Sequence, residues 1–344
     1  MEPLAIILLV IAFIVAFAIG SNDETMSPAV GSRVFSLRLA VIIGAFINLV
    51  GAISLGGGVS EKVGSDLVTG NELSLQMVFA ILISMTIWLL IVSSTKGLPI
   101  STTQCIVGSV IGVAISAPFV SASEWGAEAI NIGVLIEIFA GWIISPLIGF
   151  FIAGLVFSLV RRVQKRAEGL SGREQQEQIA AYGLAVFLIV TGLSRGGNDV
   201  ANAVAPLVNL PMFSSPLEIG ALSIPGFYIP LIVGGLGMGC GLIIIGRKVI
   251  KVLATEVVTM TPSSALSASV SVALIMFVGT YFGLPLSGTH VLVAALIAVG
   301  YVANTPVRMK QVRNIIISWI ITVPISLVVT FPVYAVVQYL LPVL

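Results

Sequence analysis

The chain has 344 residues, of which 58% are hydrophobic and only 9% are charged, with a formal net charge of +1. A soluble domain averages about 25% charged residues, so this composition excludes a water-soluble protein and indicates an integral membrane protein. The small net charge gives no indication of a nucleic-acid partner, and we expect none.

Apolar segments follow one another along the chain, and a helix needs about 20 such residues to cross a bilayer. In the first half they cover about 4–20, 39–56, 76–95, 104–117 and 131–159. In the second half they cover about 180–196, 228–246, 264–283, 289–303 and 314–341. We therefore predict an all-α integral membrane protein, in which the longer last segment of each half tilts, breaks or holds two helices.

A polar stretch with five basic residues separates the two sets of segments. It predicts a first transmembrane repeat over 1–160, a cytoplasmic linker over 161–178 and a second transmembrane repeat over 179–344. The linker is placed in the cytoplasm because basic residues concentrate on that side of a membrane.

Counting crossings outward from the linker orients the remaining basic residues. Nine of them fall on the cytoplasmic side: Arg33, Arg38, Lys96, Arg247, Lys248, Lys251, Arg308, Lys310 and Arg313. Only Lys62 falls outside, and Arg195 lies within a motif described below. The count gives each half an odd number of crossings, so we expect two inverted halves in a multi-pass protein with both termini outside.

Matching short sequences support a duplicated unit. Asn22-Asp23 matches Asn198-Asp199, residues 98–104 match 284–290, and residues 142–146 resemble 319–324. The second match lies at the cytoplasmic end of its segment in the first half and at the outer end in the second half, as inversion requires. We therefore predict two inverted-topology repeats with broken or re-entrant helices at the midplane.

Each Asn-Asp pair follows a glycine at the end of an apolar run. An Asp in hydrocarbon is unfavourable by roughly 3 kcal/mol on insertion scales, so a mirrored pair indicates a function. Glycine allows a helix to break and expose carbonyl oxygens, which with carboxylates and amides suit Na⁺ or another small cation. We predict a cation site at Asn22, Asp23, Asn198 and Asp199, with sodium at Asp23 and Asp199 and Asn202 as an accessory residue. The alternative is that each Asp only caps a broken helix.

A Pro-x-Ser-x-Thr stretch precedes an apolar run in each half. Ser and Thr are favoured N-caps, so the simple interpretation is that these residues only start helices. A helix N-terminus at the midplane also offers free N–H groups and partial positive charge to an anion. The sequence thus predicts an oxyanion site formed by Ser101, Thr102, Thr103, Ser287, Gly288 and Thr289.

Further polar residues near these motifs are candidates for accessory roles. Arg195 has no counterpart in the first motif, where Ile19 stands, and is expected either to touch an anion or to pair with an acid. Gln104 ends the first Ser/Thr stretch, and His290, the sole histidine, either relays protons or is structural. Glu24, an acid with apolar neighbours, is a further candidate for a cation or a proton.

At these motifs the chain resembles the inorganic phosphate transporter (PiT) family. That family carries two inverted copies of a Gly-Ala-Asn-Asp-Val-Ala-Asn-Ala-like motif and a Pro-x-Ser-Thr-Thr-His-like motif in each half. Residues 197–203 match the first motif closely, whereas residues 20–27 depart from it after Asp23. In the second motif, Gln104 replaces His in one copy and Gly288 replaces a Thr in the other. The resemblance covers essentially the whole chain.

The resemblance implies a symporter of inorganic phosphate and a cation, often dimeric, whose Asn-Asp pairs hold Na⁺ and whose Ser/Thr motifs hold phosphate. We expect alternating access in the cell (inner or plasma) membrane, lipid contacts and no cofactor, with Na⁺ favoured over H⁺ as the coupling ion. The first alternative is a permease for sulfate or another oxyanion. Less favoured alternatives are a channel and an intramembrane hydrolase that uses either Asp23 with Asp199 or Ser287 with His290.

Overall fold

The structure, a computed structural model, describes residues 3–61, 67–68, 73–95, 97–121, 125–166, 169–208, 210–219 and 222–341. Lys62 and Lys96 lie outside these residues. The first half contains α1 (Pro3–Gly20), α2 (Ser27–Gly31), α3 (Leu37–Glu61), α4 (Leu75–Thr95), α5 (Thr102–Val120) and α6 (Ile132–Gln164). The second half contains α7 (Gly169–Val208), α8 (Tyr228–Gly241), α9 (Arg247–Glu256), α10 (Pro262–Tyr281), α11 (Gly288–Ala303) and α12 (Met309–Leu340). A hairpin of β1 (Leu217–Ile219) and β2 (Leu222–Ile224) precedes α8.

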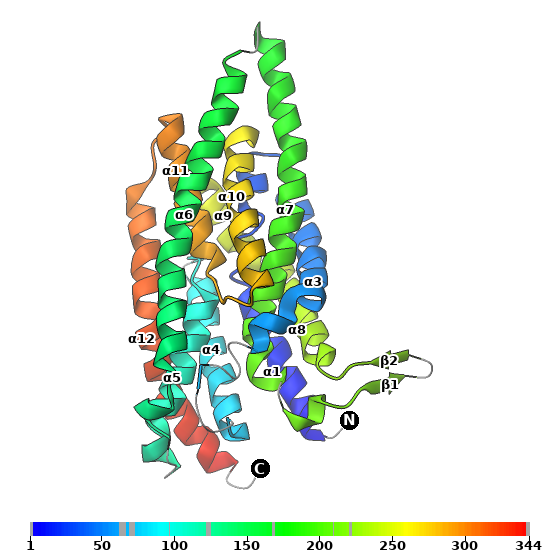
Figure 1. The fold of residues 1–344 in the computed structure, drawn as a ribbon, viewed down its shortest axis with the longest axis vertical. Helices are drawn as coiled ribbons and strands as arrows, with labels where there is room; N and C mark the ends of the chain where they lie inside the picture. Colours follow the sequence, from blue (N-terminus) through cyan, green and yellow to red (C-terminus); the bar gives the residue numbers. More distant parts are fainter. Residues whose placement is uncertain are drawn as a thin grey trace.

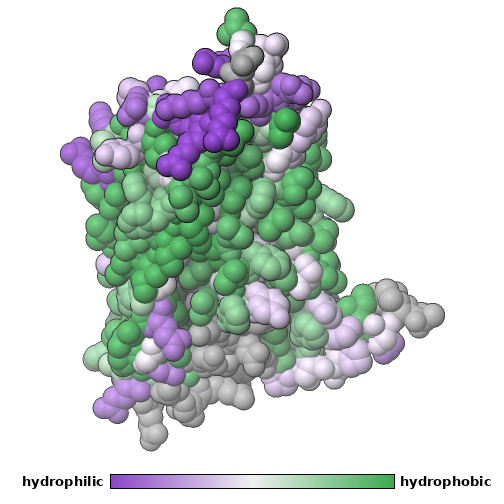
Figure 2. Space-filling view, turned by 45° about the horizontal axis from the view of Figure 1, so that its top comes forward, coloured by the Kyte–Doolittle hydropathy of each residue, from purple (hydrophilic) through white to green (hydrophobic). Residues whose placement is uncertain are grey.

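The predicted all-α membrane fold is confirmed. Nine helical stretches among the described residues are long and apolar enough to cross a membrane, and α11 is a shorter apolar helix of 16 residues. Large apolar side chains such as Phe46, Phe151 and Ile320 are 69%, 70% and 69% exposed. Figure 2 shows such side chains as a broad hydrophobic belt, with hydrophilic residues gathered beyond it at the upper end. This surface suits contact with lipid, because it carries apolar side chains where a water-soluble protein would carry polar ones.

The last segment of each half is one continuous helix. α6 has 33 residues and α12 has 32, although Pro146 lies inside α6, and Pro324 and Pro332 lie inside α12. Membrane helices tolerate interior proline because neighbouring groups satisfy the freed backbone carbonyl.

The polar stretch between the halves extends both flanking helices. α6 continues to Gln164 and α7 begins at Gly169, so a helical hairpin projects from one end of the molecule (Figure 1). The Gln164 amide donates to Glu177 Oε1 at 2.8 Å across this hairpin. Glu177 also accepts hydrogen bonds from Ser263 N at 2.9 Å and Ser263 Oγ at 2.7 Å, and thereby caps the start of α10. The carboxylate at this N-terminus also suits the helix dipole.

Two helical hairpins enter the molecule from opposite ends. In Figure 1, α4 and α5 lie in the lower half, α10 and α11 lie in the upper half, and the segment joining α10 to α11 runs near mid-height. Both chain termini lie at the end opposite the α6–α7 connection. The N-terminal ends of α5 and α11, which carry the Ser/Thr motifs, therefore point into the interior.

Helix packing is reciprocal between the halves. α1 packs on α8 and α7 packs on α3, while α5 packs on α12 and α11 packs on α6. Each of these contacts joins the two halves, and each has a counterpart in which the roles of the halves are exchanged. We keep the inverted repeat as a prediction that this reciprocity supports.

Candidate functional site

The first Asn-Asp motif lies in a break between two helices. α1 ends at Gly20 and α2 begins at Ser27, so Asp23 lies in non-helical backbone. Its Oδ1 accepts hydrogen bonds from Thr25 N at 2.9 Å and Thr25 Oγ1 at 2.5 Å, and its Oδ2 accepts one from Asn48 Nδ2 at 2.7 Å. The helix break that glycine was expected to allow is therefore present in this copy.

The second Asn-Asp motif differs, and here the expected helix break was wrong. α7 runs without interruption from Gly169 to Val208 and includes Asn198 and Asp199. The glycines serve close helix packing instead. A Cβ atom at Gly196 would lie 2.2 Å from the Asn48 carbonyl oxygen of α3, and one at Gly197 would lie 2.7 Å from Leu55 Cβ. Small residues at such crossings let membrane helices approach closely.

Both motif asparagines hold the loop that leads into a Ser/Thr motif. Asn22 Nδ2 donates to the Ile100 carbonyl at 2.7 Å, and Ile100 N donates to Asn22 Oδ1 at 3.2 Å. In the second half, Asn198 Nδ2 donates to the Leu284 carbonyl at 2.9 Å. The amides therefore satisfy backbone groups that would otherwise be unpaired inside the membrane protein.

We expect Asn22→Leu to lower the stability of the protein by about 2 kcal/mol or more, because it leaves two buried backbone groups of Ile100 without these partners. Thermal unfolding in detergent measures the effect. Ser54→Ala is the matched control, since the hydroxyl that it removes bonds, among the described residues, only to carbonyls of its own helix. Equal melting temperatures for Asn22→Leu and the control would show that the amide does not hold the loop.

Both Ser/Thr motifs start helices, as the simple interpretation predicts. Ser101 is the N-cap of α5 and accepts from Gln104 N at 3.4 Å. Ser287 is the N-cap of α11 and accepts from His290 N at 3.4 Å. Thr103 Oγ1 lies 2.8 Å from Ser101 Oγ. Capping is confirmed, and these contacts leave an additional anion-binding role open because the first-turn N–H groups face the interior.

All four motifs meet at one buried ion-pair cluster, whose charged members are Asp23, Glu24, Arg195 and Asp199. These residues are 2%, 0%, 3% and 2% exposed, respectively. Arg195 donates to Asp199 Oδ2 from Nε at 3.2 Å and from Nη2 at 3.0 Å, and it also donates to Glu24 Oε1. Arg195 Nη1 lies 3.8 Å from Asp23 Oδ1. The predicted pairing of Arg195 with an acid is therefore present, and one guanidinium joins the acids of both halves.

One threonine from each Ser/Thr motif reaches this cluster from the other half of the chain. Thr102 Oγ1 donates to Asp199 Oδ1 at 2.9 Å, and Thr289 Oγ1 donates to Glu24 Oε1 at 2.9 Å. The N-terminal turns of α5 and α11 thus converge on the same acids. With every group ionised, three carboxylates and one guanidinium leave the cluster with a charge of about −2, which favours cation binding in a low-dielectric interior.

Several oxygen atoms beside the cluster have no hydrogen-bond partner among the described residues. They are Glu24 Oε2, Asn48 Oδ1, Asn198 Oδ1 and Asn202 Oδ1. Buried polar atoms are normally paired, so each of these acceptors has capacity for a cation or for water. Carboxylate and amide oxygens are the ligand types that hard cations take.

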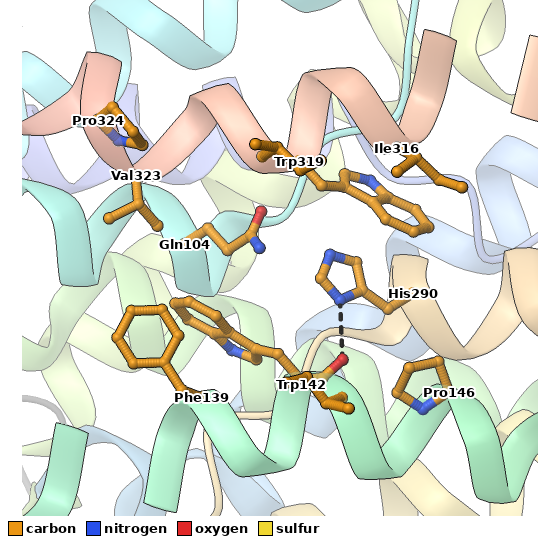
Figure 3. A pocket seen from close by; sticks show the side chains of 11 residues that line it. Gln104, Phe139, Trp142, Pro146, His290, Ile316, Trp319, Val323 and Pro324 are labelled. Carbon is orange, nitrogen blue, oxygen red and sulfur yellow. Dashed lines mark hydrogen bonds between the residues drawn. The ribbon is translucent and has the colours of Figure 1, made fainter. Parts of the chain in front are cut away.

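Gln104 and His290 face a different cavity, drawn in Figure 3. This cavity of about 480 Å³ lies between α6 and α12, and the rings of Trp142 and Trp319 line it. His290 Nδ1 lies 3.4 Å from the Trp142 carbonyl, and its ring stacks on Trp319 with centroids 4.0 Å apart. Neither residue makes a hydrogen bond to the ion-pair cluster among the contacts described. The hydrogen bond expected of a Ser287–His290 nucleophile pair is absent, because Nδ1 faces the Trp142 carbonyl and Nε2 has no partner among the described residues.

The sequence analysis missed Asn48 as a member of the site, and it placed Glu24 outside the predicted cation and oxyanion motifs. Asn48 interrupts the long apolar run of α3, and that interruption was the available signal. Glu24 was only a further candidate for a cation or a proton, without a motif to support it. Its pairing with Arg195 joins residues 171 positions apart in the chain, which no local pattern indicates.

Comparison with known proteins adds an independent finding. A sequence profile described as the phosphate transporter family matches residues 19–330. A putative phosphate permease of Thermococcus kodakarensis is 27% identical, over 96% of this chain and 97% of that protein. The chloroplastic inorganic phosphate transporter 2-1 of Arabidopsis thaliana is 26% identical, over 92% of this chain and 69% of that protein.

The fold also matches a solved structure. A structure described as the sodium-dependent phosphate transporter superposes with a TM-score of 0.84 at 24% sequence identity. The match covers 98% of this chain and 100% of the other. At this identity the likeness shows a shared fold.

Proposed function

Because the chain belongs to the phosphate transporter family, we propose that it is a secondary active transporter that moves inorganic phosphate across a membrane together with a cation. Members of this family are transporters and not enzymes, so the hydrolase alternatives are set aside. The observation that carries the proposal is the convergence of both Asn-Asp motifs and both Ser/Thr motifs on one buried ion-pair cluster.

In this proposal the acids bind the coupling cation, with Na⁺ favoured over H⁺. The acidic cluster and the unpartnered oxygen atoms of Glu24, Asn198 and Asn202 support sodium at Asp23 and Asp199, assisted by Asn198 and Asn202. Asn22, next to Asp23 in the chain, is proposed as a further ligand. The sodium-dependent transporter with the same fold also supports this choice. A cation at the acids lowers the electrostatic barrier to bringing an anion next to them.

We assign phosphate to the two N-terminal turns that converge on the cluster, with the ligands Ser101, Thr102, Thr103, Ser287, Gly288 and Thr289. Free N–H groups and the positive ends of two helix dipoles favour an oxyanion there. The arrangement supplies donors from both hairpins, so the bound anion would join the two halves. No resident cofactor is needed in this scheme.

Alternating access requires the halves to move against each other. The bonds of Thr102 to Asp199, Thr289 to Glu24 and Arg195 to Glu24 all join one half to the other. We propose that substrate and cation replace some of these bonds during transport, so that rocking does not leave buried charges unpaired.

We further propose a cell-membrane location with the α6–α7 hairpin in the cytoplasm and both termini outside. The basic residues of that hairpin and the shared position of the termini support this orientation. A homodimer in the lipid bilayer is also proposed, on the resemblance to the family alone.

Uptake of radiolabelled phosphate into proteoliposomes tests the function. We expect an inward Na⁺ gradient to stimulate uptake, and an equal K⁺ gradient to have no such effect. A proton gradient in K⁺ medium tests H⁺ coupling, and labelled sulfate tests the alternative substrate. Phosphate uptake that no ion gradient stimulates would contradict coupled transport.

A further inference from the structure

The two halves differ at three positions that come together in the ion-pair cluster. The differences are Arg195 in place of the first half's Ile19, Glu24 in place of the second half's Val200, and Gly288 in place of the first half's Thr102. They are far apart in the chain, but Arg195 contacts the other two. We treat these three residues as one unit.

Gly288 provides the space that Arg195 occupies. A Cβ atom at Gly288 would lie 2.6 Å from Arg195 Nε, 2.9 Å from Cδ and 3.0 Å from Cζ. A threonine at position 288 would therefore clash with the Arg195 guanidinium where it lies now, so the two cannot both be present. The guanidinium lies beside the tip of the α10–α11 hairpin where the repeat would otherwise place a second threonine.

Glu24 balances the charge that Arg195 brings. Arg195 donates to Glu24 Oε1, and Thr289 Oγ1 donates to the same oxygen at 2.9 Å. An acid and a base are added together, so the net charge of the site matches that of a symmetric site with only Asp23 and Asp199. The unit changes the kind of hydrogen-bonding group at the site and leaves the total charge as it was.

A hydroxyl and a guanidinium differ as ligands for an oxyanion. A threonine hydroxyl both donates and accepts, whereas a guanidinium only donates, through a fixed fork that fits paired oxygen atoms. The singly charged H₂PO₄⁻ carries two hydroxyl groups that need acceptors, while HPO₄²⁻ and sulfate present more bare oxygen atoms. Because the guanidinium is charged and only donates, it favours bare oxygen atoms next to it and hence the doubly charged anion, while Glu24 offsets its charge in the site as a whole.

We propose that Glu24, Arg195 and Gly288 place a fixed guanidinium beside the phosphate site and so make the transporter select doubly charged oxyanions over H₂PO₄⁻. The inference rests on the proposed function. Among the described residues, the charged groups that face Arg195 are Asp23, Glu24 and Asp199, and α3, α5 and α11 contribute the uncharged Asn48, Thr102 and Thr289.

The first experiment measures sodium-stimulated phosphate uptake by the native protein from one pH unit below neutrality to one above, with sulfate as competitor. We expect the KM for total phosphate to fall as the dianion fraction rises. Sulfate stays doubly charged over this range, so its inhibition constant reports any titration of the protein itself. Absence of phosphate uptake would refute the proposed function, whereas uptake with a pH-independent KM, or without inhibition by sulfate, would refute only this inference.

The second experiment removes the three differences that make up this unit. The triple variant Glu24→Val, Arg195→Ile, Gly288→Thr carries the residues of the opposite half at all three positions. We expect it to lose the fall in KM with pH and to bind sulfate about tenfold more weakly, which corresponds to about 1.4 kcal/mol. Gly288→Thr alone is expected to be inactive and to regain uptake when Arg195→Ile and Glu24→Val are added together, since removing Arg195 alone would leave the buried Glu24 unpaired.

A second variant keeps the inference testable if the triple variant does not fold. Glu24→Gln with Arg195→Gln keeps side chains of similar length at both positions and removes both charges. It is expected to show the same weakening of sulfate inhibition and the same loss of the fall in KM with pH. Retention of native sulfate inhibition and of the native pH dependence in either folded variant would overturn the inference.

Discussion

Asp199→Asn is expected to abolish sodium-stimulated phosphate uptake, with a loss of about 100-fold or more, equivalent to about 2.8 kcal/mol. The substitution keeps the size of the side chain but removes the negative charge that faces Arg195 and Thr102. A hard cation depends on carboxylate charge for its affinity, and an amide oxygen supplies only a dipole. Asp23→Asn is expected to have the same effect through the other half of the site.

Proteoliposome uptake at saturating and limiting sodium measures this prediction. Glu218→Gln is the matched control, because it also removes one carboxylate charge but lies exposed on β1, where it accepts a hydrogen bond from Ser223. The control is expected to transport like the native protein. Native uptake in both Asp variants would refute the assignment of the cation site to these residues.

Gly196→Ala is expected to have the largest effect on folding. Its Cβ atom would lie 2.2 Å from the Asn48 carbonyl oxygen and 2.6 Å from Asn48 Cα. Backbone cannot move aside as the end of a side chain can, so α3 and α7 would have to separate. We expect a loss of about 3 kcal/mol or more in stability, at the upper end of the range for overpacking. Loss of transport follows, because Asn48 also holds Asp23.

Gly57→Ala in α3 is the control for this substitution. Among the described residues, a Cβ atom at Gly57 would meet nothing within 4 Å, so alanine there is expected to stabilise the helix by up to about 1 kcal/mol. Thermal unfolding in detergent and the yield of monodisperse protein compare the two variants. If both alanine variants unfolded at the native temperature, close packing of α3 on α7 would not limit stability.

Much of the fold followed from local sequence. Runs of apolar residues predicted the helices, because a bilayer requires continuous apolar surface and internally bonded backbone. Predicted segments such as 228–246 differ from the structure mainly at their ends, since the helix continues through a π-helical turn, Leu242–Gly246, into α9. A helix can continue beyond the membrane with polar side chains. The pattern of apolar residues does not show where such a helix ends.

The residues of the site were also largely visible in the sequence. Acids and amides in apolar surroundings are unfavourable unless paired or used, so Asp23 and Asp199 were noticeable without a structure. The same reasoning identified the Ser/Thr helix starts, whose capping the structure confirms. Their roles in binding stay predictions until transport is measured.

The sequence by itself determined that this is a helical membrane protein and that it carries matching polar motifs in its first and second parts, because bilayer solvation acts on each segment separately. Only the tertiary structure decided that α7 stays helical through its motif, that Asn48 holds Asp23, and that Gly288 makes room for Arg195. These features depend on contacts between helices far apart in the chain, and such contacts arise from packing that no single segment encodes.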